Sequence, residues 1–187
     1  YNSDGTNLWT QMFGSSKEDD SEFIKISDDG SIYVAGQTKG DLGGQINNYE
    51  YSGFISKFDS SGNVQWTKLT DYWVYSLEIG DNDSIYVSGE ANEGNSYISL
   101  FNSEGDVLNS GVFASIEDIN TNDIEELTIS SDGSIVFTGR SNESSYLAKY
   151  NSNNTFLSYS WQSSTDNSNW SEISTSSTYT LTSAEEG

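Results

Sequence analysis

Acidic and amide side chains at alternate positions form one candidate cation site. The set comprises Asp118, Asn120, Asn122 and Glu126. This spacing follows the first part of a calcium-binding loop, in which oxygen ligands recur at every second residue. The glycine that such a loop needs at its sharp turn is replaced by Asp123, and the distal bidentate glutamate is absent. The pattern therefore leaves two interpretations open, a bound calcium ion or a plain solvated loop, and no cofactor is required.

Three neighbouring aromatic side chains form a second candidate site, in this case for a sugar. Trp73 interrupts the repeat pattern described below, and Tyr72 and Tyr75 lie beside it. Exposed aromatic rings mark ligand-binding surfaces and can stack on the apolar faces of sugar rings. A sheet can bury the same rings equally well, so the sequence predicts either a weak glycan site or core packing.

The residue types that are missing exclude several classes of catalytic chemistry. The chain contains no histidine and no cysteine, which excludes Ser–His–Asp catalysis, imidazole or thiolate metal sites and cysteine nucleophiles within it. Paired carboxylates can hydrolyse glycosides, but acids are too common here for one pair to indicate a glycosidase. We therefore expect a module that is not an enzyme.

The charge balance restricts the partners. The chain of 187 residues carries 29 acidic and 7 basic side chains, a formal net charge of −22. Nucleic acid is not expected as a partner, because phosphate binding draws on clustered Lys and Arg. Membrane insertion is not expected either, because no stretch approaches the roughly 18 apolar residues of a spanning helix. Divalent cations and a salty medium are compatible surroundings for such a chain, because both screen the repulsion among its acids.

A repeat of about fifty residues organises most of the chain. Its first unit is FIKISDDGSIYVAGQT, matched by SLEIGDNDSIYVSGEA and LTISSDGSIVFTGRS; its second is SGFISKFDSSGNVQW, matched by NSYISLFNSEGDVL and SSYLAKYNSNNTFL. Asp, Asn and Gly between two apolar runs favour tight hairpin turns. Each copy therefore contains two hairpins, and hence four strands.

The second predicted strand of each copy is apolar at consecutive positions, over 32–35, 85–87 and 135–137. A half-exposed strand would alternate, so these strands are expected to be covered on both faces. The glycines that follow, Gly36, Gly89 and Gly139, are expected to allow a close approach of another backbone. Stacked blades of four antiparallel strands meet both expectations, and the predicted fold is all-β and propeller-like.

The order of these motifs resembles the β-propeller repeat of large secreted and surface proteins of bacteria. The matching residues are Asp20, Gly30, Tyr33, Gly36, Phe54, Lys57, Gly62 and Trp66 in the first copy, and Asp123, Gly133, Gly139 and Lys149 in the third. The second copy departs from the pattern, with Leu100 in place of the lysine and Trp73 in place of the leading aspartate. The resemblance covers residues 1–157 and implies blades over about 16–70, 71–113 and 117–157.

The segment 4–14 matches the fourth strand of a preceding blade, with Trp9 in the position of Trp66. Strand 6–12 could complete the third blade, whose own fourth strand at 155–158 is poorly formed. Three blades are fewer than the four to eight that are usual in propellers. Dimerisation or flanking sequence would supply the remainder.

The tail over 158–187 differs in character from the repeats. Its motifs YSWQSSTDNSNWSEI and SSTYTLT resemble the opening of an immunoglobulin-like repeat found in giant surface proteins of cyanobacteria and other bacteria. The resemblance implies a partial β-sandwich. About thirty residues cannot bury an independent core, so the tail is expected to depend on other sequence.

These patterns predict a non-catalytic scaffold or adhesion module of a large extracellular bacterial protein, with other domains of the same chain as partners. One alternative is a carbohydrate-binding or carbohydrate-active module. Another is a self-assembling structural protein that pairs through the open edges of its blades.

Overall fold

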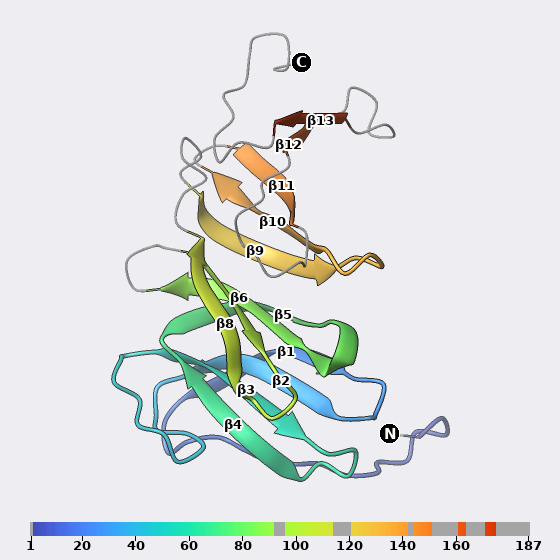
Figure 1. The fold of residues 1–187 in the computed structure, drawn as a ribbon. Coiled ribbons are helices and arrows are strands. Elements are labelled where there is room, and N and C mark those ends of the chain that lie inside the picture. The colour runs from blue at the N-terminus through green and yellow to red at the C-terminus, as the bar shows by residue number, and fades with distance from the viewer. Residues whose placement is uncertain are drawn as a thin grey trace.

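The computed structural model is all-β and consists mainly of three antiparallel sheets stacked one above the other (Figure 1). It describes residues 2–91, 96–113, 121–141, 144–150, 161–163 and 171–174. The predicted fold class, propeller-like blades of antiparallel strands, is confirmed by these sheets. Within the described residues no helix has the length and apolar character needed to cross a membrane.

Each blade is a simple meander in which consecutive strands pair. Blade 1 comprises β1 (Asp19–Ile26), β2 (Ile32–Thr38), β3 (Ser52–Phe58) and β4 (Val64–Thr70). Blade 2 comprises β5 (Tyr72–Ile79), the short 3₁₀ turn η1 (Asp81–Asp83), β6 (Ile85–Ala91), β7 (Ser96–Phe101) and β8 (Val107–Phe113). Blade 3 comprises β9 (Thr121–Ile129), β10 (Ile135–Ser141) and β11 (Ser144–Tyr150) among the described residues.

The tail contributes one described hairpin, β12 (Trp161–Ser163) paired with β13 (Ser171–Ser174). The remainder of 158–187 lies outside the described residues, as does the predicted strand at 155–158. The immunoglobulin-like resemblance therefore stays a prediction.

The turn between the first two strands is held by the aspartate of its motif. In blade 1 the carboxylate of Asp29 accepts hydrogen bonds from the Ser27 hydroxyl at 2.6 Å and the Ser31 backbone N–H at 2.7 Å. These bonds lower the pKa of Asp29 to about 2. In blade 3 Asp132 accepts the same two kinds of bond from Ser130 and Ser134. The motif therefore fixes a hairpin by local hydrogen bonding.

Among the described residues, the core consists of two apolar clusters, each of which joins neighbouring blades. The first cluster contains Tyr33, Ala35, Ile55, Tyr72, Val74, Leu77, Ile85, Val87 and Phe101. The second contains Ile98, Ile124, Leu127, Ile135, Phe137 and Tyr150. Within β6, Ile85 and Val87 belong to the first cluster, whereas Tyr86 packs against the second. The second strand of blade 2 is thus covered on both faces, as its consecutive apolar residues predict.

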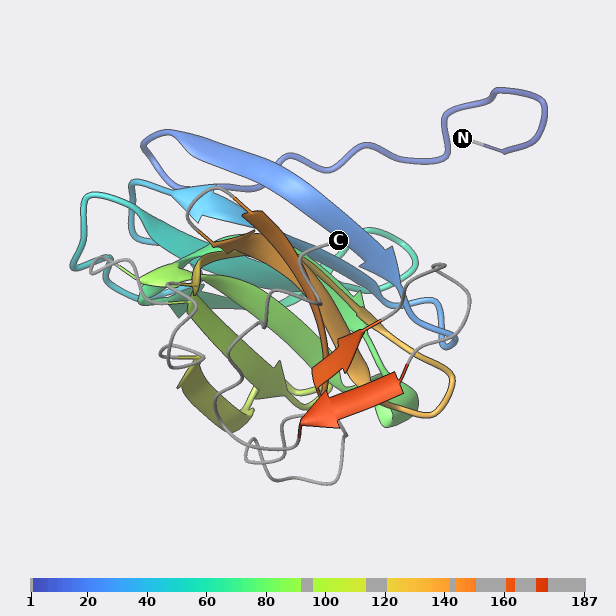
Figure 2. The ribbon, with the colours of Figure 1, turned by 90° about the horizontal axis from the view of Figure 1, so that it is seen from above.

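The first strands of the blades lie next to one another. β5 contacts both β1 and β9, whereas β4 and β8 form the opposite edges of their sheets. Figure 2 shows the same stack from above. We call the side of the stack formed by β1, β5 and β9 the axial side, because the innermost strands of a propeller surround its axis.

Candidate functional site

All three axial strands carry a β-bulge at the same position. The pairing of β1 with β2 skips Glu22, the pairing of β5 with β6 skips Tyr75, and the pairing of β9 with β10 skips Glu125. A bulge inserts one extra residue into a strand and redirects its side chain. The same device therefore recurs at one position of every blade.

A glycine on the second strand makes this bulge possible. A Cβ atom on Gly36 would lie 1.9 Å from the carbonyl oxygen of Asp20, and one on Gly89 would lie 1.6 Å from that of Trp73. No side chain fits at either distance. The predicted close approach of a backbone at these glycines is confirmed for both residues. In blade 3, Gly139 pairs with Ile124 beside the equivalent bulge.

The bulge and the register define three matched axial positions in the blades. The leading position holds Asp20, Trp73 and Asp123; its partner on the second strand holds Gln37, Glu90 and Arg140; the bulge holds Glu22, Tyr75 and Glu125. Blades 1 and 3 carry acids at the leading and bulge positions. Blade 2 carries an aromatic residue at both.

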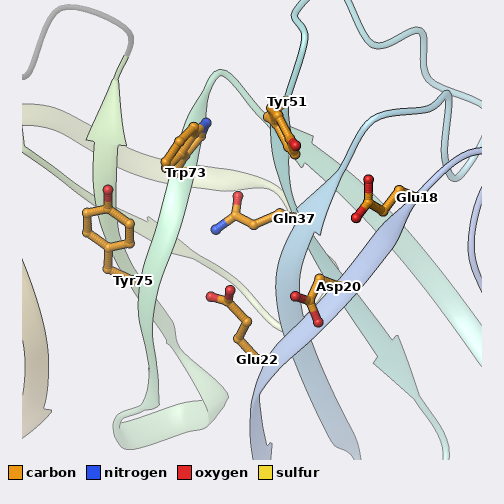
Figure 3. A pocket seen from close by; sticks show the side chains of 7 residues that line it. All are labelled: Glu18, Asp20, Glu22, Gln37, Tyr51, Trp73 and Tyr75. Carbon is orange, nitrogen blue, oxygen red and sulfur yellow. The ribbon is translucent and has the colours of Figure 1, made fainter.

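Five of these residues, all from blades 1 and 2, line a cleft of about 390 Å³, which we call the axial cleft. Its lining residues are Glu18, Asp20, Glu22, Gln37, Tyr51, Trp73 and Tyr75 (Figure 3). Figure 3 shows Asp20 and Glu22 on one strand and Trp73 and Tyr75 on another, with Gln37 between them; Glu18 directly precedes β1. A second cleft of about 440 Å³, lined by Phe23, Tyr75, Glu90, Glu125 and Arg140, shares Tyr75 with it and continues toward blade 3.

The aromatic side of the axial cleft is accessible and held in place. Trp73 is 42% exposed. The Tyr51 ring meets it edge-on, with centroids 5.8 Å apart and an angle of 65° between the planes. The Tyr75 hydroxyl donates a hydrogen bond of 2.7 Å to the Glu90 carboxylate. These contacts restrain both rings, while Trp73 stays exposed to solvent.

The acidic side of the axial cleft contains three carboxylates. Burial raises the pKa of Glu22, the charge of Asp20 raises it further, and a hydrogen bond from Gln37 opposes both effects. Glu18 forms an ion pair of 2.5 Å with Lys39, whose ammonium group also lies 4.6 Å from the centroid of the Tyr51 ring. The lining residues include no basic side chain. The cleft is therefore suited to hydroxyl and ammonium donors rather than anions.

The three aromatic residues predicted to form a glycan site, Tyr72, Trp73 and Tyr75, point to opposite faces of β5. Trp73 and Tyr75 both line the axial cleft, because residues two apart share a face of a strand. Tyr72 points the other way, is 7% exposed, and stacks on Tyr97 with centroids 5.3 Å apart. The prediction grouped Tyr72 with the other two, and the structure corrects this: Tyr72 is a core residue.

The predicted calcium loop lies partly outside the described residues. Asp118 and Asn120 lie outside the described residues, Asn122 lies in β9, and Glu126 is an exposed residue of β9. Among the described residues there is no group of three or more His, Cys, Asp or Glu placed to hold a metal ion. Calcium therefore stays a prediction for this loop.

Sequence reasoning missed the acids, the amide and one aromatic ring of the axial cleft: Glu18, Asp20, Glu22, Gln37 and Tyr51. A signal was present for the first three, because acids alternate at 18, 20 and 22 and thus share one face. Tyr51 gave no signal, since it is the last residue of the stretch 39–51, which contains no strand.

Comparison with known proteins gives little further information. No family model matches the chain, and no curated protein matches it. Among solved structures it is similar to a protein provisionally described as a gluconolactonase, with 15% sequence identity and a TM-score of 0.45. The match covers 70% of this chain and 43% of the other, so the chain spans less than half the length of that structure.

Proposed function

We propose that this chain is a non-catalytic binding module of an extracellular or cell-surface bacterial protein, and that it holds a glycan in the axial cleft. The observation that carries the proposal is the departure of blade 2 from its sister blades. At the leading and bulge positions, where blades 1 and 3 have acids, blade 2 has Trp73 and Tyr75. Both replacements face the same cleft.

The chemistry of the cleft favours a neutral or amino sugar. The exposed ring of Trp73 offers a flat apolar surface, while carboxylates across the cleft accept hydrogen bonds from hydroxyl or ammonium groups. Three acids without a basic side chain among the lining residues would repel uronic or sialic acids. The ligand class is therefore a glycan without negative charge.

A non-catalytic role belongs to the same proposal. The axial acids of blades 1 and 3 occupy repeated positions, which is typical of residues retained with a structural repeat. The chain has no histidine or cysteine to serve as base or nucleophile. Adhesion through glycans would also unite the expected scaffold function with the carbohydrate-binding alternative.

A glycan array followed by calorimetry tests the proposal. Trp73→Ala should weaken binding of the best neutral or amino glycan at least tenfold, because loss of one aromatic stack costs about 1.4 kcal/mol. Tyr49→Ala is the matched control, since Tyr49 is also an exposed aromatic residue but does not line the cleft. It should change affinity less than twofold.

Three results would overturn the proposal. One is an array on which no uncharged or amino glycan binds, and another is an equal loss of affinity in the two variants. The third is release of new reducing ends from the bound glycan, which would make the module an enzyme.

A further inference from the structure

The second cleft, which extends the axial cleft toward blade 3, gathers side chains from all three axial strands. β1, β5 and β9 contribute Phe23, Tyr75 and Glu125 to its lining. The second strands of blades 2 and 3 add Glu90 and Arg140. Its volume of about 440 Å³ and the 390 Å³ of the axial cleft both fall within the range of about 300 to 1,000 Å³ that is usual for ligand pockets.

Tyr75 is a wall that the two clefts share. It is the residue that bulges from β5, and hydrogen bonds from two directions hold this part of the strand. From blade 1, the Gln37 side-chain amide donates a hydrogen bond of 2.9 Å to the backbone carbonyl of Val74, directly before the bulge. Within blade 2, the Tyr75 hydroxyl donates its bond of 2.7 Å to Glu90, which lines the second cleft. The two clefts are therefore parts of one surface with a fixed aromatic ring at its middle.

The side chains of the second cleft suit a sugar unit. The carboxylates of Glu90 and Glu125 accept hydrogen bonds and the Arg140 guanidinium donates them, while a sugar hydroxyl can do both. Phe23 is partly buried against the first core cluster, so it adds an apolar surface that the core holds in place. Two acids and one base leave the lining with a negative balance, which disfavours anionic sugars here as in the axial cleft.

A ligand that contacts both ends of this surface must cross the axial edge of blade 2. In the stack of sheets, blade 2 lies between blade 1, which carries Asp20 and Glu22, and blade 3, which carries Glu125 (Figure 1). Stacked sheets pack about 10 Å apart, which is wider than one sugar ring. Contact with the acids of both outer blades therefore requires more than one sugar unit.

We infer that the ligand is an oligosaccharide of neutral or amino sugars, and that it runs from the axial cleft over Tyr75 into the second cleft. The inference rests on the proposed function, because it extends the glycan that the axial cleft is proposed to hold. One sugar unit stacks on Trp73, and another meets Glu125 and Arg140 of blade 3. All three blades then contribute to one elongated site.

Calorimetry with glucosamine and glucose oligomers of one to four units tests the inference. For the series that binds, affinity should rise at least about thirtyfold from the monosaccharide to the tetrasaccharide, because only the longer oligomers reach the second cleft. A longer oligomer also offers more units to a single site, but that alone raises affinity only in proportion to their number. Saturation should occur at one tetrasaccharide per chain, since both clefts hold the same molecule.

Glu125→Ala carries the test to the second cleft itself. It should lower the affinity for the tetrasaccharide about fivefold, because a hydrogen bond to a carboxylate is lost, and leave the affinity for the monosaccharide unchanged. Glu126→Ala is the matched control. It removes the same charge from the neighbouring exposed residue of β9, which is not among the lining residues of either cleft. It should change neither affinity by more than twofold.

Several results would overturn the inference while leaving the proposed function in place. Affinity could rise no faster than the number of units, or the Glu125 and Glu126 variants could lose affinity equally. Two tetrasaccharides bound per chain would make the clefts separate sites. An array-positive protein that binds no glucosamine or glucose oligomer would also refute it. An array on which no uncharged or amino glycan binds contradicts the proposed function itself, and this inference with it.

Discussion

The axial strands of blades 1 and 2 share a backbone and differ in their side chains. β1 and β5 both bulge opposite a glycine whose missing Cβ makes room for a carbonyl oxygen. At the two positions that face the cleft, β1 has Asp20 and Glu22, whereas β5 has Trp73 and Tyr75. The comparison indicates that the blades share a bulge that presents two side chains to the axial cleft, and that the blades differ in which side chains they present there.

The largest expected effect, a loss of stability, comes from substituting the glycine that lies opposite the bulge. Gly89→Ala would place a Cβ atom 1.6 Å from the carbonyl oxygen of Trp73, so the bulge would have to rearrange. We expect a loss of about 3 kcal/mol or more in the free energy of unfolding, measured by chemical denaturation. Gly44→Ala is the control, because a Cβ atom there meets nothing within 4 Å and only its positive φ opposes the change. It should cost about 1 kcal/mol. Equal costs for the two variants would refute the role given to Gly89.

A smaller effect is expected from the acids of blade 1. Asp20→Asn should lower the preference for an amino sugar over its neutral counterpart about threefold, because an ion pair in a solvated cleft contributes about 0.6 kcal/mol. Calorimetry with matched glucosamine and glucose oligomers measures this preference. Asp28→Asn removes one charge at an exposed turn outside the cleft and should leave the preference unchanged. An unchanged preference in Asp20→Asn would assign recognition to the aromatic side alone.

The smallest effect concerns the pH dependence of stability. Glu22 has a folded-state pKa above its ordinary value of 4.5, so its ionised form is disfavoured in the folded state. The penalty is present above the raised pKa, decreases as the pH falls through it, and is absent below about 4.5. Glu22→Gln should therefore stabilise the protein at pH 7 by a few tenths of a kcal/mol, since solvent screens this partly exposed group, and should do nothing at pH 4.

Melting temperatures at pH 4 and pH 7 measure this difference, with Asp28→Asn as the control for the change in net charge. A stabilisation by Glu22→Gln that is as large at pH 4 as at pH 7 would contradict the raised pKa.

The blades could be predicted from sequence because each copy repeats the same turns and apolar strands. The bulges could not be predicted from sequence. Because all three copies contain a bulge, the spacing from the leading residue to the glycine is the same in each copy. Asp20 to Gly36, Trp73 to Gly89 and Asp123 to Gly139 are each 16 residues apart. An alignment of copies therefore shows no insertion where the strand bulges.

The candidate site was predictable only in part. Trp73 was identified because it breaks the repeat, and Tyr75 because it lies near it. Tyr72 was included because it is adjacent to Trp73 in the sequence, although alternation along a strand directs its side chain to the opposite face. Tyr51 reaches the cleft from a long irregular connection, and only the folded chain brings it to Trp73.

The central claim is that the aromatic residue at the leading position of blade 2 carries recognition. Replacing one cross-strand pair of blade 2 by that of blade 1 tests this claim most directly. In blade 1 Asp20 pairs with Gln37, and in blade 2 Trp73 pairs with Glu90. The variant Trp73→Asp with Glu90→Gln gives blade 2 the pair of blade 1, and Glu90→Gln alone is its control. We predict that the double variant melts within about 3 °C of the parent protein and binds the array-selected glycan at least tenfold more weakly. The control should retain binding, because a glutamine oxygen at position 90 can still accept the hydrogen bond from the Tyr75 hydroxyl. Unchanged affinity in a folded double variant would show that the aromatic residue of blade 2 does not carry recognition.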